Sequence, residues 1–366
     1  MKGFVFVLAV LLSCSDALWA QYEFTTEREI ACTSVKNQAR TATCWSYSTL
    51  SFLESELLRL GHPSHDLSEM FIVRNIYRDK ALNYVLRQGK ANFSQGSLSH
   101  DVLRAYTRGG IVPESVFSGL PDGQETHNHK ELEAALRGLL EGVVESKRPS
   151  AQWLDAFDCI LDTYLGTAPE TFVVGEQQYT PEQFANSLPL VPDDYVTLTS
   201  FTHHPFYRSF ILEIPDNYSN GSYYNVPLDD LQAVVDQALA AGYTVAWDGD
   251  VSEKGFNAKK GVAVLPVTPD REDLFEQPGA EVTVDQQNRQ DNFMNYNTTD
   301  DHLMHLTGTA TDQNGKRYYQ VKNSWGELST HGGFLYMSQP YFRMKTVGVM
   351  VHKDAIPASV RRRLQI

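Results

Sequence analysis

The sequence predicts an α+β fold of two lobes, with a helical first half and a second half rich in strands. Apolar residues recur at helical spacing in the first half, whereas short apolar stretches bounded by turn residues dominate the last third. A chain of 366 residues can form one large domain or two smaller ones with a substantial core. A cleft between two such lobes is a usual place for a substrate site.

The strongest helix of the first half is expected to begin at Cys44 and to run to Leu60. Leu50, Leu53 and Leu57 recur at helical spacing, and the glycine that follows Leu60 is a stop signal. Thr180-Pro181-Glu182 has the pattern of a helix start with proline at the first position. Further helices are expected over Leu67–Asn83, Ser99–Arg108, Lys130–Lys147, Ala151–Leu165 and Leu228–Ala241.

Strand patterns replace helical ones in the last third of the chain. Asn314-Gly315 is a typical two-residue turn, and it predicts a hairpin between the strands that flank it. The expected strands are Val262–Leu265, Leu303–Ala310, Arg317–Lys322, Phe334–Ser338 and Val347–Val351.

The charge balance excludes several classes of partner. Lysine and arginine number 31 against 45 aspartate and glutamate residues, so the formal net charge is −14 at pH 7. This acidity is unsuited to nucleic acid, whose phosphates need basic groups, and to anionic membrane surfaces. After the N-terminal region, no apolar run reaches the ~20 positions that a membrane span needs.

The first twenty residues, 1–20, have the pattern of an export signal. Lys2 gives a positive start, residues 3–12 form an unbroken apolar run, and small residues follow up to Ala20. In a second interpretation the signal is cut before Cys14, which is lipidated and anchors a bacterial lipoprotein. Both cleavage sites stay open. The domain over residues 21–366 is expected to be periplasmic, secreted or held at the surface.

Cys44 stands where a helix can activate a thiol. A side chain in the first turn lies at the positive end of the helix dipole, near unpaired backbone N–H groups. Both features favour the thiolate, which is the nucleophilic form of cysteine. Gln38, six residues before Cys44, can direct an amide N–H at a developing oxyanion, and the backbone N–H of Cys44 is the second candidate donor.

Partners for this thiol lie near the other end of the chain. A histidine can accept the thiol proton and later protonate a leaving amine, and His302 is the expected residue. Asn323 can orient that ring, and Trp325 can shield their hydrogen bond from water. His305 competes with His302, but residues three apart on a strand point to opposite faces. We therefore expect only one of the two to meet Cys44 and the other to have a packing role.

The order Gln-x5-Cys-Trp, then His, then Asn-Ser-Trp-Gly resembles the papain superfamily of cysteine peptidases. Within it, the chain most resembles the bleomycin hydrolase and aminopeptidase C branch, from about residue 30 to residue 357. The segments that carry this resemblance are Lys36-Asn37-Gln38, Arg40, Cys44-Trp45, residues 50–56, Leu67-Ser68-Glu69, Gly110-Ile111-Val112-Pro113, Asn225-Val226-Pro227, Asp250-Val251 and Lys322-Asn323-Ser324-Trp325-Gly326.

The resemblance implies a papain-like fold whose helical lobe carries the nucleophile on a central helix, with the catalytic cleft facing an antiparallel β-rich lobe. It implies that Cys44 is the nucleophile, His302 the general acid and base, Asn323 the orienting residue and Gln38 the oxyanion donor. Trp45 and Trp325 support them. Peptides are then the expected substrates, with no cofactor and no metal, and a homo-oligomer is left open by the family resemblance.

The cysteines depart from the pattern of papain itself. Thr41 stands where papain has a structural cysteine, which fits the branch without disulfides. Cys32 and Cys159 are left as a candidate pair if the protein is exported, although spacing cannot test it. Otherwise Cys159, between apolar neighbours, is expected to be a buried thiol.

The C-terminal region is a second departure. In the branch, an extended tail lies in the cleft, and its carboxylate meets the α-amine of the substrate. Here the sequence continues only a short way past Pro357, and it carries Arg361-Arg362-Arg363. Aminopeptidase specificity therefore stays open, although another acidic group could replace the tail. Residues 130–190 resemble a helical insertion that could narrow the cleft instead.

Two histidine clusters give weak metal patterns. His127-Asn128-His129 and His203-His204 lack the neighbouring cysteine, histidine or carboxylate spacing of a zinc site, so exposed loop histidines are expected. Asp300-Asp301 is expected to be a solvated turn, with Asp301 beside His302 and able to tune it.

The sequence thus predicts a hydrolase that cleaves peptide bonds through a Cys44 thioester and is similar to aminopeptidase C and bleomycin hydrolase. An exported endopeptidase and an acyltransferase, in which an amine replaces water, are alternatives on the same fold. A non-catalytic binding protein is a third, and the joint presence of Gln38, Cys44, His302 and Asn323 counts against it.

Overall fold

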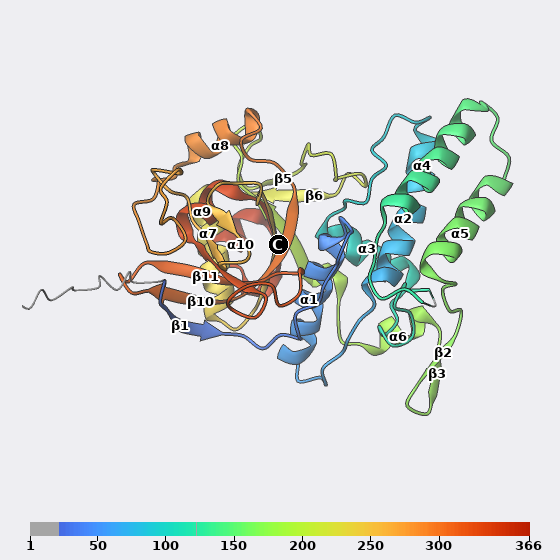
Figure 1. Cartoon of the computed structure of the whole chain (residues 1–366), viewed down its shortest axis with the longest axis horizontal. Helices are drawn as coiled ribbons and strands as arrows, with labels where there is room; N and C mark the ends of the chain where they lie inside the picture. Colours follow the sequence, from blue (N-terminus) through green and yellow to red (C-terminus); the bar gives the residue numbers. More distant parts are fainter. Residues whose placement is uncertain (1–21, 122) are drawn as a thin grey trace, which may run out of the picture.

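The computed structural model describes residues 22–121 and 123–366. The expected export signal and Cys14 lie outside the described residues and stay predictions. A helical lobe and a lobe built on a large sheet lie side by side, with helix α1 between them (Figure 1). This confirms the predicted α+β fold of two lobes.

The helical lobe contains the helices of the first half of the chain. Most of them begin close to the predicted residue. α2 begins two positions later than expected because Ser68 caps it, its hydroxyl accepting a hydrogen bond from the backbone N–H of Phe71 at 3.0 Å. The helices are α1 (Cys44–Arg59), α2 (Glu69–Leu86), α3 (Ser99–Gly109), α4 (Lys130–Glu145), α5 (Gln152–Leu165) and α6 (Pro181–Ser187).

The second lobe is an 11-stranded, mainly antiparallel sheet with β10 near its centre. The predicted hairpin joins β10 to β11, and Gly315 in its turn has a positive φ of 76°. In sheet order the strands are β5 (Arg208–Ile211), β6 (Ser222–Asn225), β4 (Tyr195–Thr199), β13 (Thr346–His352), β7 (Val245–Gly249), β10 (His302–Asp312), β11 (Arg317–Lys322), β12 (Phe334–Ser338), β9 (Val262–Ala263) and β8 (Phe256–Asn257), and β1 (Phe24–Glu29) also pairs with β10.

Further helices belong to the second half of the chain, and α7 packs its apolar residues into the core of the sheet. Val235 and Leu239 of α7 share this core with Leu306 of β10 and Val321 of β11. These helices are α7 (Leu228–Ala240), α8 (Gln286–Met294), α9 (Gln339–Lys345) and α10 (Ala358–Leu364). A separate hairpin of β2 (Phe172–Val174) and β3 (Gln177–Tyr179) follows α5.

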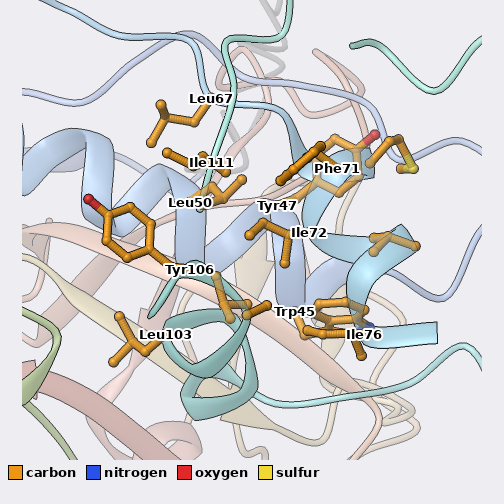
Figure 2. Close-up of a cluster of buried hydrophobic side chains, with 14 of the residues drawn as sticks. Trp45, Tyr47, Leu50, Leu67, Phe71, Ile72, Ile76, Leu103, Tyr106 and Ile111 are labelled. Atoms are coloured by element: carbon orange, nitrogen blue, oxygen red, sulfur yellow. The ribbon is translucent and has the colours of Figure 1, made fainter. Parts of the chain in front are cut away.

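Helix α1 is buried on all sides except at its C-terminal end. Apolar and small residues surround its axis, as expected for a helix inside a core rather than on a surface. Figure 2 shows Trp45, Tyr47 and Leu50 of α1 packed against Ile72 and other residues of the helical lobe. On the other side, the hydroxyl of Ser48 donates to the backbone oxygen of Met304 at 2.8 Å. The first turn of α1 is thereby fixed against the start of β10.

Candidate active site

Cys44 is the first residue of α1, as predicted, and its side chain is buried. The next residue, Trp45, holds the first turn of α1 in place, because its indole Nε1–H donates to the backbone oxygen of Gln95 at 2.9 Å. The backbone N–H groups of a first helical turn have no partners inside the helix, so they favour a negative charge at Cys44.

His302 is the first residue of β10, and Asn323 directly follows the partner strand β11. Pairing of the two strands brings these residues together. The Nε2–H of His302 donates to Oδ1 of Asn323 at 2.9 Å. The ring of Trp325 lies beside the imidazole with 4.6 Å between centroids, so it covers this side of the ring.

A cavity of about 270 Å³ brings Cys44 and His302 to one surface. Gln38, Trp45 and Trp325 line the same cavity, and Asn323 reaches it through its bond to His302. The structure therefore gathers every predicted site residue at the interface between the lobes, although these residues span most of the sequence.

Gln38 reaches the cavity because its segment pairs with the segment around Ser324. The backbone N–H of Gln38 donates to the backbone oxygen of Ser324 at 2.8 Å, and the hydroxyl of Ser324 donates to Oε1 of Gln38 at 2.6 Å. The amide Nε2 donates one proton to the backbone oxygen of Thr41 at 2.7 Å. An amide NH₂ has two protons, so one remains for another acceptor.

Burial dominates the electrostatics of the Cys44 and His302 pair. It raises the pKa of the Cys44 thiol to about 12, while a backbone hydrogen bond from Leu303 acts in the opposite direction. Burial also lowers the pKa of His302 to about 4, opposed by the hydrogen bond to Asn323. Neither charge forms alone near neutral pH, but transfer of the thiol proton to the ring creates both charges together, each with an opposite partner.

The same cavity has an acidic side that sequence analysis did not identify. Asp216, Asp300 and Asp301 line it, and none of the described residues that line it is a lysine or an arginine. The expected solvated turn is wrong for Asp300, whose Oδ2 is buried and has no hydrogen-bond partner in the described part of the chain. Asp301 is exposed, and its carboxylate accepts from the backbone N–H groups of Val251 and Ser252.

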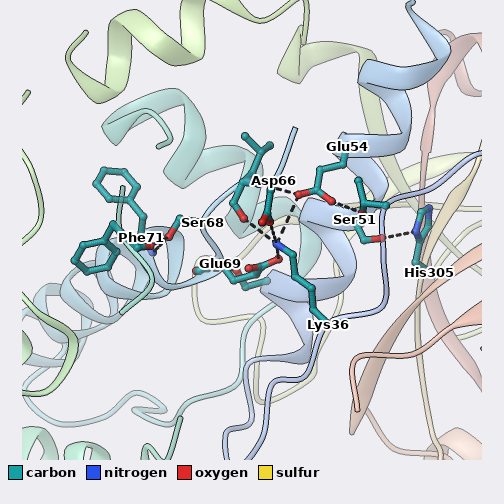
Figure 3. A network of polar contacts seen from close by, with 12 residues as sticks. Lys36, Ser51, Glu54, Asp66, Ser68, Glu69, Phe71 and His305 are labelled. Atoms are coloured by element: carbon teal, nitrogen blue, oxygen red, sulfur yellow. Dashed lines mark hydrogen bonds and ion pairs between the residues drawn. The ribbon is translucent and has the colours of Figure 1, made fainter. Parts of the chain in front are cut away.

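His305 lies outside this cavity, in a buried polar network on the opposite face of β10 (Figure 3). Its Nδ1 lies 2.9 Å from the hydroxyl of Ser51, which in turn accepts from the ammonium group of Lys322 at 2.8 Å. The same figure shows Lys36 surrounded by the carboxylates of Glu54, Asp66 and Glu69. The alternation of β10 thus separates the two histidines as expected.

One group of side chains lies close enough together to hold a metal ion, although the sequence around His203-His204 lacks the ligand spacing of a zinc site. Ligand atoms of His203, His204 and Glu213 lie within 4.8 Å of one another. Gln290, however, accepts from the backbone N–H of Thr202 through Oε1 and therefore directs Nε2–H at Nδ1 of His203. A histidine that binds metal through Nε2 needs Nδ1 to donate instead. The group is a cluster of His–Glu contacts.

The histidines at 127 and 129 are buried, so the expectation of exposed loop residues is wrong for them. Nδ1 of His129 lies 3.1 Å from the hydroxyl of Tyr77. Burial lowers the pKa of His127 to about 4 and that of His129 to about 3. Their segment is fixed by backbone hydrogen bonds to Arg40, so it supports the loop that precedes Cys44.

Cys32, Cys44 and Cys159 are free thiols, so the candidate pair of Cys32 with Cys159 is wrong. Cys159 is also exposed rather than buried. The reason is helical spacing: α5 buries Phe157 and Leu161, four residues apart, and Cys159 between them points outward.

The C-terminal residues lie away from the cavity. Leu364 and Ile366 pack into the core of the β-rich lobe, and the guanidinium of Arg363 lies 3.4 Å from the ring centroid of Tyr207. None of residues 357–366 lines the cavity that holds Cys44. None of the helices in the described part of the chain combines the length and apolar character of a membrane crossing.

The fold and this site define a papain-like cysteine peptidase, with the thiol on the central helix and the histidine and asparagine on the β-rich lobe. The chain belongs to the Peptidase C1-like family, whose family model matches residues 170–365, more than half of the chain. That match includes His302 and Asn323.

Relatives in sequence and a solved structure agree with this family assignment. The chain is 25% identical to aminopeptidase G of Lactobacillus delbrueckii subsp. lactis, over 89% of this chain and 82% of the relative. It is 22% identical to bleomycin hydrolase of Rattus norvegicus, over 89% of this chain and 82% of the relative. The structure of PepW from Lactobacillus rhamnosis HN001 shares the fold, with a TM-score of 0.75 at 19% identity, covering 93% of this chain and 84% of that one.

Proposed function

We propose that Cys44 is the nucleophile of this peptidase, His302 its general acid and base, Asn323 the orienting residue and Gln38 an oxyanion donor. The observation that carries this proposal is the single cavity lined by Cys44 and His302, together with the 2.9 Å bond from Nε2 of His302 to Asn323. Because Nε2 holds its proton in that bond, Nδ1 is the nitrogen that accepts the thiol proton.

Acylation then follows from these roles. Nδ1 of His302 accepts the thiol proton while Sγ of Cys44 attacks the peptide carbonyl carbon, which forms the C–S bond and an oxyanion. The remaining amide proton of Gln38 and the backbone N–H of Cys44 donate to that oxyanion. Collapse breaks the C–N bond, and His302 returns its proton to the leaving amine.

Deacylation uses the same residues. His302 accepts a proton from water, whose oxygen attacks the thioester carbon, and the C–S bond breaks to release the carboxylic acid, which loses its remaining proton to the solvent. His302 then returns its proton to the Cys44 thiolate. Trp325, beside the imidazole, keeps water away from the bond that holds His302 in position.

We further propose that the enzyme is an aminopeptidase. Relatives named aminopeptidase G, W and C match about nine-tenths of the chain, and this supports the proposal. The direct test compares two forms of one fluorogenic peptide, with a free and with a blocked N-terminus. Loss of cleavage on blocking is the expected result, and equal cleavage of both would identify an endopeptidase.

The nucleophile is tested with Cys44→Ala and the matched variant Cys159→Ala. Cys44→Ala should lower kcat by at least about 10³-fold, because no thioester can form. Cys159 is exposed on α5, so its removal should leave the rate unchanged. Normal circular dichroism of both variants is the control for folding, and persistent turnover by Cys44→Ala would overturn the assignment.

A further inference from the structure

The acidic side of the catalytic cavity is built by a segment that crosses between the lobes. Residues 212–221 connect β5 to β6 and reach the helical lobe, as the loop beside these strands in Figure 1 shows. There Nδ2 of Asn92 donates to Oδ1 of Asp216 at 3.1 Å, and the ammonium group of Lys80 lies 5.3 Å from the ring centroid of Tyr218. These contacts fix Asp216 on the cavity wall.

Asp216 is packed against the backbone of the opposite wall. A Cβ atom added at Gly96, which also lines the cavity, would lie only 1.8 Å from Oδ2 of Asp216. No other residue type fits at this position without displacing the carboxylate. The position of Asp216 is therefore determined from both lobes.

Asp300, on this wall, forms a buried acid pair with Asp248, which does not itself line the cavity. Asp248 of β7 is only 4% exposed, and neither of its carboxyl oxygens has a hydrogen-bond donor in the described part of the chain. Oδ2 of Asp300 is buried and lacks a donor too. The two carboxyl groups face each other and form a hydrogen bond only when one of them is protonated. Unlike Asp301, this pair has acceptor capacity that no neighbour uses.

The negative charge of this wall affects the pKa of the Cys44 thiol. After burial itself, the carboxylates of Asp300, Asp248 and Asp216 are causes that raise the pKa of the Cys44 thiol. Lys80, a cation that acts on Asp216 and Asp300, is buried behind the wall, where its ammonium group donates to the backbone oxygen of Gly96. The carboxylates of the wall therefore oppose the thiolate, and a cation bound in the cavity would remove this opposition.

We propose that Asp300, supported by Asp248 and Asp216, binds the α-ammonium group of the N-terminal residue of a peptide substrate. This inference rests on the proposed function, because it places the ammonium relative to the carbonyl that Cys44 attacks. In an N-terminal residue the amino nitrogen is two bonds from that carbonyl carbon, so its site must adjoin the sulfur. An ammonium group supplies three donors, and the carboxylates of Asp300 and Asp216 line the cavity that it would enter.

Binding and activation are then coupled. The ammonium ion neutralises the charge that disfavours the thiolate, so a free N-terminus should improve kcat as well as KM. A blocked N-terminus would leave the acid pair unsatisfied and place an amide against it. Selectivity for N-terminal residues would thus arise from charge in the wall beside the nucleophile.

The first test measures kcat/KM for free-amine and N-acetylated forms of one aminoacyl fluorogenic amide. Asp300→Asn should lower kcat/KM for the free-amine form by about 10- to 100-fold, the effect of losing a hydrogen bond to a charged group. The acetylated form should change by less than about threefold. Asp301→Asn is the matched control: it removes the same charge from the same cavity, but Asp301 is already bonded to backbone N–H groups, so its effect on selectivity should be smaller.

A second readout does not depend on substrate cleavage. The pH dependence of alkylation of Cys44 by iodoacetamide, followed on the Cys44 peptide by mass spectrometry, reports the pKa of the thiol. Asp300→Asn should lower that pKa, and an amino acid amide added to the wild type should do the same. Asp300→Asn and the wild type share the other charged groups that face Asp300, so a difference between their profiles reports on Asp300 alone. These groups are Asp248, Asp216, Asp301 and Lys80.

Two results would overturn the inference while leaving Cys44 as nucleophile. One is a ratio of free-amine to blocked cleavage that is the same in Asp300→Asn and wild type. The other is an alkylation profile that Asp300→Asn does not shift. Asp216→Asn should also lower the ratio of free-amine to blocked cleavage, but by less than Asp300→Asn does. The inference therefore remains testable if Asp300→Asn folds poorly. Failure of the proposed function would instead appear as turnover by Cys44→Ala.

Discussion

Gln38 illustrates how much one side chain depends on its partners at this site. Gln38→Ala should lower kcat by about 10²- to 10³-fold with little change in KM, because an oxyanion donor acts mainly in the transition state. Ser324→Ala, which removes the hydroxyl that holds Oε1 of Gln38, should cost less because the amide remains. Steady-state kinetics of both variants is the measurement, and an effect of Gln38→Ala confined to KM would contradict an oxyanion role.

At the residue scale, the sequence was sufficient for the motif residues and insufficient for the acidic wall. Cys44 and Asn323 lie within local patterns that are specific. Strand alternation placed His302 and His305 on opposite faces, and the family resemblance favoured His302. Asp216 lies in no motif. Asp300 resembles a solvated turn residue, because its burial arises only when strands and segments far apart in sequence pack around it. Only tertiary structure could reveal these carboxylates.

At the scale of elements, α1 carries both the proposed nucleophile, Cys44, and a large part of the core. Leu53→Ala should lower the free energy of unfolding by about 2–5 kcal/mol, since the site is fully packed. Leu86, at the end of α2, is 80% exposed, so Leu86→Ala should change the free energy of unfolding by less than about 0.5 kcal/mol. Urea denaturation of the two variants tests this contrast. Similar losses for both would mean that α1 is not packed as described.

Helices and strands were predicted correctly where the hydrophobic pattern repeats over a long segment, and they were missed where the segment is short. The helices of the first half and the hairpin of β10 and β11 have several turns or clear alternation, and they were predicted. β7 was missed because all five of its residues are buried in the middle of the sheet, so it has no alternation. β5 and β6 have four residues each, and their pairing depends on partners distant in sequence.

For the whole molecule, several acids are buried near the interface of the lobes, and they make stability depend on pH. Burial raises the pKa of Glu69 to about 8 and that of Glu114 to about 7, although Lys36 acts against both shifts. Their pKa in the unfolded chain is about 4.3. Between these values the folded state binds more protons than the unfolded state, so these groups lower stability as pH rises from about 4 to about 8.

Glu114 offers a test of this dependence, because its Oε2 is buried without a hydrogen-bond partner in the described part of the chain. Glu114→Gln replaces the carboxylate by a neutral group of similar shape, so the variant avoids the cost of ionising a buried acid. Its Tm should exceed that of the wild type by a few degrees at pH 8.5, and this advantage should shrink as pH falls towards 4. Glu145→Gln, on the exposed surface of α4, is the matched control and should show no such trend. Parallel pH profiles for Glu114→Gln and wild type would mean that Glu114 is not buried as an acid with a raised pKa.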